Sequence, residues 1–176
     1  MKSFRFIIAL AILALLPAEA VVYAKPPPSS AVCNITCTVA DIAEWSHDSF
    51  SAIDLGNLTA ENREASGSAS LVLYTNGDVQ IIADSSDASR LSKDAVHNLA
   101  TRYKLEYDTA GTGQTGGPTA GWCDYDRFLI NGSQVTHICG DGAVEVILSV
   151  RAFKNTARAG ESGTYTARQT LTVCWK

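Results

Sequence analysis

Apolar and polar residues alternate along most of this chain. The clearest run spans Gly163–Trp175, and its apolar face is formed by Tyr165, Ala167, Leu171, Val173 and Trp175. A period of two places successive side chains on opposite faces of an extended strand. Similar runs occupy residues 68–75, 78–84, 103–107 and 143–153. The sequence therefore predicts an all-β fold, a single immunoglobulin-like antiparallel β-sandwich.

Asn-Gly pairs separate several of these runs. Asn76-Gly77 lies between residues 68–75 and 78–84 and predicts a two-residue hairpin, because both turn positions require a positive φ. A second Asn-Gly pair predicts another hairpin, with strands at 128–130 and 135–139.

Only one segment has the spacing of a helix. Leu91, Ala95 and Leu99 recur every four residues, so we expect at most one short helix within residues 89–100. Residues 109–121 are rich in glycine and indicate a long loop.

The first residues indicate where the protein goes. Lys2 and Arg5 precede an apolar run at residues 6–16, and small-residue cleavage patterns end at Ala20 and Ala24. This order is typical of a secretory signal peptide, and the run is shorter than the roughly 20 residues of a membrane span. We therefore expect a secreted, periplasmic or cell-surface protein without a transmembrane anchor, with cleavage after either alanine.

The rest of the chain divides simply. If residues 1–24 are the signal peptide, residues 25–30 form a Pro/Ser-rich linker and residues 31–176 a single β-sandwich domain. The formal net charge of −4 argues against nucleic acid as a partner.

All five cysteines follow the leader: Cys33, Cys37, Cys123, Cys139 and Cys174. Export favours oxidation, so we expect up to two disulfides and one leftover thiol. If residues 31–40 form a strand, Cys33 and Cys37 lie about 13 Å apart and do not pair with each other unless a turn intervenes. We expect them to bridge to Cys123 and Cys139, which leaves Cys174 free. Zinc is the weaker alternative, because no second close Cys/His pair is present.

No motif in the sequence indicates an active site, a cofactor or a metal. His47, His97 and His137 each stand alone, and the nucleophile turn G-x-S-x-G is absent. We therefore expect a protein without catalytic activity and without a bound cofactor.

Three aromatic residues suggest a different function. Trp45, Trp122 and Tyr125 lie in or beside expected loops and could stack on a glycan, as in a carbohydrate-binding module. The alternative, which we favour, is that the two tryptophans plug the ends of the sandwich.

The pattern Gly163-Thr164-Tyr165, followed by a threonine-rich alternation, resembles the closing strand of spore coat protein U and related chaperone–usher pilin-like domains. Cys33–Val39, Tyr103–Tyr107, Trp122 and Gly140–Gly142 have looser counterparts there.

The resemblance implies a structural or surface-assembly subunit whose sandwich lacks a strand. Such subunits are completed by a strand from another copy or another surface subunit, by β-strand addition. Residues 25–40 are the candidate donor, since Ala31, Cys33, Ile35, Cys37 and Val39 alternate in the required way. The alternative, which we favour from the sequence, is that this segment forms the first strand of its own sandwich.

Overall fold

The structure is a computed structural model that describes residues 29–108, 113–154 and 161–176. Residues 1–38 and 39–176 form separate units, and all strands lie in the second. The strands are β1 (Ala43–Trp45), β2 (Glu64–Thr75), β3 (Val79–Ala83), β4 (Ala100–Tyr107), β5 (Ala120–Asp124), β6 (Ser133–Val135), β7 (Ala143–Phe153) and β8 (Leu171–Trp175). The expected signal peptide and most of the expected linker lie outside the described residues.

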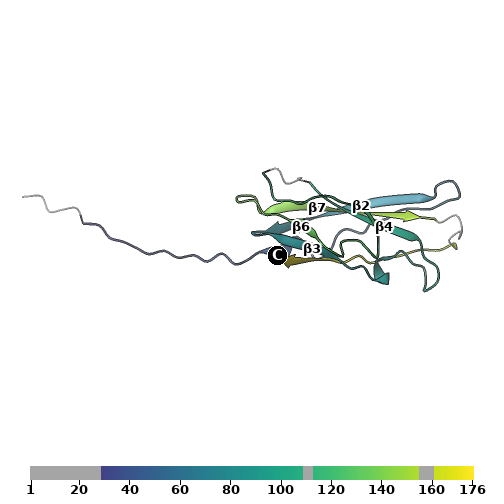
Figure 1. Cartoon of the computed structure of the whole chain (residues 1–176), viewed down its shortest axis with the longest axis horizontal. Helices are drawn as coiled ribbons and strands as arrows, with labels where there is room; N and C mark the ends of the chain where they lie inside the picture. Colours follow the sequence, from purple (N-terminus) through teal and green to yellow (C-terminus); the bar gives the residue numbers. More distant parts are fainter. Residues whose placement is uncertain (1–28, 109–112, 155–160) are drawn as a thin grey trace, which may run out of the picture. The chain divides into compact units, whose positions relative to one another are not determined.

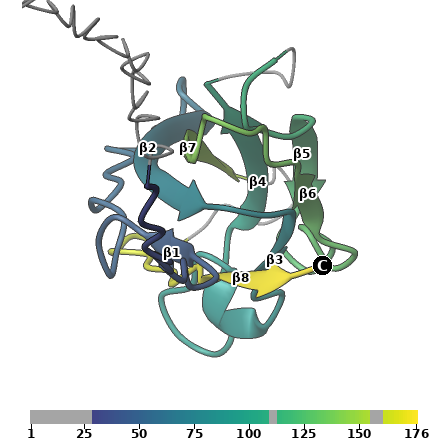
Figure 2. The ribbon, with the colours of Figure 1, turned by 90° about the vertical axis from the view of Figure 1, so that its left-hand side faces the viewer.

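The strands form two antiparallel sheets with a core between them (Figures 1 and 2). One sheet has the order β1-β2-β7-β4-β5, and the other has the order β6-β3-β8. Core side chains come from both sheets, for example Leu73, Leu105 and Val146 from the first and Ile81 and Val135 from the second. The predicted all-β sandwich is confirmed.

β7 is the central strand of the larger sheet, and its alternation is as predicted. It pairs with β2 from Ala143 to Phe153 and with β4 from Val146 to Phe153. Its core-facing residues Val144, Val146, Leu148 and Val150 are buried.

The Asn76-Gly77 turn exists, but the predicted hairpin is wrong. β2 pairs with β1 and β7, whereas β3 pairs with β6 and β8, so the turn carries the chain from one sheet to the other. The Asn76 side chain accepts from the Ile42 N–H and donates to the Ala40 carbonyl, both at 2.8 Å. A Cβ at Gly77 would lie 2.7 Å from the Trp175 ring. These long-range contacts fix a crossover instead of a hairpin.

The second predicted hairpin is also wrong. Residues 125–131 form turns, and the strand beyond them is only β6. Phe128 and Leu129 are both buried, and consecutive strand residues face opposite sides, so a half-exposed strand could not bury both. Leu129 instead adopts a φ of 49°, in the left-handed region.

Near residues 89–100 the structure has one short 3-10 helix, at Asp87–Ser89, which agrees with the expectation of at most one short helix there. The chain then doubles back, with the N–H of Leu99 donating to the Leu91 carbonyl at 2.9 Å, and Ala95 exposed at the tip. The four-residue spacing therefore does not mark a buried helical face.

Residues 31–40 form no strand, so the favoured interpretation of this segment as the first strand of its own sandwich is wrong. The first strand is β1. Val32, Ile35 and Val39 are 86%, 87% and 73% exposed. The last strand is shorter than predicted, since β8 begins at Leu171 rather than at Gly163.

We expect Leu105→Ala to lower the free energy of unfolding by about 2–5 kcal/mol, because the leucine is completely buried between the sheets. Val96→Ala, at a site 74% exposed, is the control and should change it by less than about 0.5 kcal/mol. Urea denaturation measures both. Equal effects of the two substitutions would contradict the assignment of the core.

Candidate functional site

The sandwich is open along one side. Two hollows of about 490 and 620 Å³ adjoin there, and both are lined by Ile53, Leu55, Leu91 and Tyr165. We call them together the open groove. Its two walls are residues 48–58 and residues 161–171.

The floor of the open groove is the core itself. It is formed by apolar side chains of the larger sheet, each at most 9% exposed: Ala65, Leu71, Tyr103, Leu148, Val150 and Ala152. An apolar floor of this kind favours a partner that brings apolar side chains.

The first wall, residues 48–58, is held by side chains rather than by sheet pairing. Ile53 and Leu55 pack over Gly67 of β2, where a Cβ would lie 2.6 Å from the Ile53 methyl group. Within the described residues, the one hydrogen bond of this segment is from the Gly56 N–H to Asp54 Oδ1, at 2.8 Å. The segment therefore covers part of the core without completing a sheet.

The second wall presents an unpaired strand edge. Thr166 exchanges two backbone hydrogen bonds of 3.0 Å with Ser92, and the Arg168 N–H donates to Ala88. These alternate residues pair on one side of the segment. Tyr165, Ala167 and Gln169 alternate with these paired residues. Their backbone groups point to the groove side and make no backbone hydrogen bond to described residues.

This edge continues along β8, which is the outer strand of its sheet and lies beside β1 (Figure 2). Edge strands are commonly protected against further pairing by proline, lysine or a bulge. Residues 163–175 contain no proline or lysine, and Arg168 is their one charged residue. Along β8 the edge has β1 beside it, so the part that is open to an added strand is residues 165–169.

The three aromatic residues proposed to bind a glycan are not brought together. Trp45 lies on β1 and Trp122 on β5, at opposite edges of the larger sheet. Trp45 packs against the core and Phe50, as expected for a plug. Trp122 does not plug the sandwich end, because it lies on the outer face of its sheet with the Arg151 guanidinium 4.3 Å from its ring centre.

The ring and the hydroxyl of Tyr125 also contact other side chains. The Arg90 guanidinium lies 5.4 Å from its ring centre, and its hydroxyl donates to Asp87 at 3.2 Å. Arginine thus covers one ring face each of Tyr125 and Trp122, which leaves the three aromatic residues without a common stacking platform.

All five cysteines are free thiols in this structure. Cys33, Cys37 and Cys139 are exposed. Cys123 is half-buried against the core, and Cys174 is half-buried on β8, pairing in register with Gln80. The bridges expected from export stay a prediction.

Comparison with known proteins identifies no relative. Neither the protein-family models nor the curated proteins give a match. Within the described residues, no helix has the length and apolar character to cross a bilayer, and no three potential metal ligands come together.

Sequence reasoning did not find the groove. The alternation from Tyr165 to Leu171 is typical of a strand, but alternation does not show whether both edges of that strand are paired. Residues 48–58 carry no strong period, and their wall position depends on Gly67, distant in sequence.

We expect two tyrosines to ionise at about pH 12. Burial raises the pKa of Tyr103, in the groove floor, and of Tyr107 to about 12, because the charged phenolate is poorly solvated there. The folded protein then keeps protons that the unfolded chain loses near pH 10, so stability should fall between pH 10 and 12. Ultraviolet absorbance titration with Tyr103→Phe as control checks this. Ionisation of every tyrosine near pH 10 would contradict it.

Proposed function

We propose that this protein is an exported, non-enzymatic structural subunit that assembles at the cell surface with copies of itself, in the manner of pilin-like or coat-like subunits. Assembly occurs by β-strand addition to the open groove. The observation that carries the proposal is a row of backbone groups without backbone partners among the described residues, at Tyr165, Ala167 and Gln169, along a groove whose floor is the apolar core. In this interpretation the sandwich is immunoglobulin-like and is completed by its neighbour.

The occupant we propose is residues 31–39 of a second copy. Their odd-numbered residues are apolar and their even-numbered residues are mostly polar, so one face suits the groove floor and the other suits water. A strand of nine residues spans about 30 Å, which is long enough to run along the open part of the edge at residues 165–169.

Burial of apolar side chains favours this addition. Ile35 and Val39 are 87% and 73% exposed, and burying such a side chain is worth about 1.5–3 kcal/mol each. The edge supplies the second contribution, since each backbone hydrogen bond made there adds about 0.5–1.5 kcal/mol. Together these gains oppose the entropy lost when the segment becomes ordered.

We expect Ile35→Asp to abolish assembly, because it places a charge on the groove-facing side of the added strand. The matched control is Asn34→Asp, which adds the same charge on the opposite side and should leave assembly intact. Sedimentation velocity over a range of concentrations measures both. A protein that stays monomeric at high concentration, or equal effects of the two variants, would contradict the proposal.

A proline variant tests the other partner of the contact. Ala167→Pro removes an N–H that faces the groove and should weaken assembly at least tenfold, while its thermal unfolding changes little because that N–H has no backbone partner. If Ala167→Pro assembles as strongly as the unmodified protein, the added strand does not pair with this edge and the proposal is contradicted.

Export also predicts the redox state. In protein isolated from its native compartment, we expect two disulfides among Cys33, Cys37, Cys123 and Cys139, formed between copies because residues 31–39 lie on the neighbour, with Cys174 alkylated. Intact mass after alkylation, with and without reduction, counts the thiols. Five alkylated thiols without reduction would contradict both the bridges and the oxidising location.

A further inference from the structure

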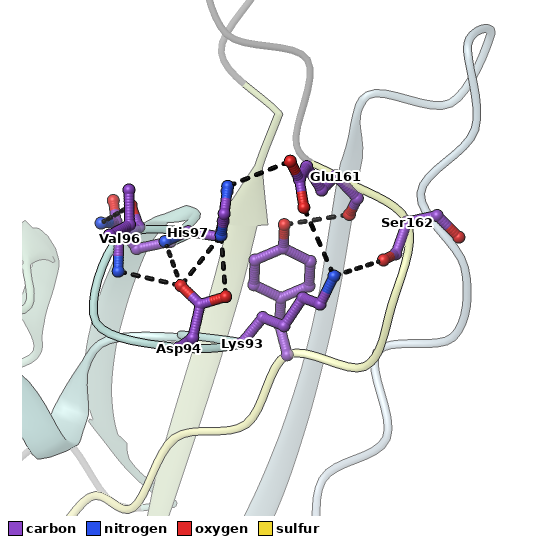
Figure 3. A network of polar contacts seen from close by, with 8 residues as sticks. Lys93, Asp94, Val96, His97, Glu161 and Ser162 are labelled. Carbon is purple, nitrogen blue, oxygen red and sulfur yellow. Dashed lines mark hydrogen bonds and ion pairs between the residues drawn. The ribbon is translucent and has the colours of Figure 1, made fainter.

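A charged network lies at one end of the open groove (Figure 3). The His97 ring stands between two carboxylates. Its Nδ1 is 2.8 Å from Asp94 Oδ2, and its Nε2 is 3.2 Å from Glu161 Oε1. Lys93 Nζ reaches Glu161 Oε2 at 3.5 Å and donates to the Ser162 carbonyl at 2.9 Å.

The geometry requires a charged ring. A neutral imidazole carries one N–H and can donate to only one carboxylate, whereas the imidazolium donates from both nitrogens. The second carboxylate would otherwise face a lone pair. Asp94 stays ionised throughout, because the backbone N–H of His97, followed by its ring and the Val96 N–H, lowers the Asp94 pKa to about 2.

The network fixes a wall of the groove. Within the described residues, the hydrogen bonds and ion pairs from residues 161–164 to the other side of the network come from His97 and Lys93 alone. The Tyr165 hydroxyl donates to the Glu161 carbonyl at 3.0 Å, which ties this end of the wall to the start of the strand edge. Directly beyond it, Thr166 pairs with Ser92, one residue before Lys93.

We propose that His97 is a pH-sensitive latch that orders the strand edge of the open groove. When the ring is protonated, Asp94 on its own loop and Glu161 on the wall are held together through it. When the proton leaves, the ring can donate to only one carboxylate, and Asp94 is the nearer, at 2.8 Å against 3.2 Å for Glu161. Glu161 then keeps only Lys93, and the wall loosens. The latch is therefore closed at acidic pH and open at alkaline pH.

The latch regulates the proposed strand addition and rests on that function for its role. An ordered edge binds an incoming strand without the cost of first fixing residues 161–166, so acidic pH should favour addition.

The first test follows the latch without any partner. We expect the hydrogen-exchange protection of the Ser92 and Thr166 amides, corrected for intrinsic rates, to fall about five- to tenfold between pH 5.5 and 8, as for loss of an exposed ion pair and its hydrogen bond. His97→Gln should remove this pH dependence, and His47→Gln, on the other side of the groove, should keep it. Unchanged protection in the unmodified protein, or the same pH dependence in His97→Gln, would overturn the latch.

The second test measures the groove. A labelled peptide of residues 29–41, with serine at both cysteine positions, is titrated into the non-assembling Ile35→Asp protein. We expect affinity several-fold higher at pH 5.5 than at pH 8, and equal at both in the combined His97→Gln variant. Binding that ignores pH overturns the regulatory role. If the peptide binds at neither pH, strand addition is overturned instead. The hydrogen-exchange data then test the latch by themselves.

Discussion

The burial of one face of β7 between two partner strands is the constraint on which the rest of the structure depends. Val144, Val146, Leu148 and Val150 form a continuous apolar row, and β2 and β4 pair with β7 along most of its length. The row is longer than the smaller sheet that covers it, because β3 and β8 have only five residues each. Part of the core must therefore be covered by something other than a sheet.

Two segments of different kinds cover this part of the core. Residues 48–58 supply apolar side chains, and residues 161–170 supply an extended backbone that is paired on one side only. Neither segment closes the sandwich. The unpaired edge and the groove over the core therefore arise from a single mismatch in strand length, which is why they occur at the same place.

The long alternating strands, such as β7, were predictable from the sequence, whereas the short strands β1 and β5 and the pairing of all strands were not. The alternation in residues 143–153 sets which side chains enter the core, whatever strand lies alongside. Asn76-Gly77 shows the limit: the turn is local, but Ile42 and Trp175 decide which sheet follows it. His97 shows the same limit. Glu161, the second carboxylate beside its ring, comes from a segment distant in sequence, so no local pattern predicts the contact.

The two walls also explain why a strand suits this groove better than a small ligand or a compact protein surface. The wall at residues 48–58 already covers part of the apolar floor, so an added segment gains apolar contact only over the remainder. What remains unsatisfied is the row of backbone groups at Tyr165, Ala167 and Gln169, spaced two residues apart. Only an extended backbone has donors and acceptors at that spacing. An extended segment with one apolar face can pair with these backbone groups and also contact the apolar floor. Residues 31–39 have that pattern.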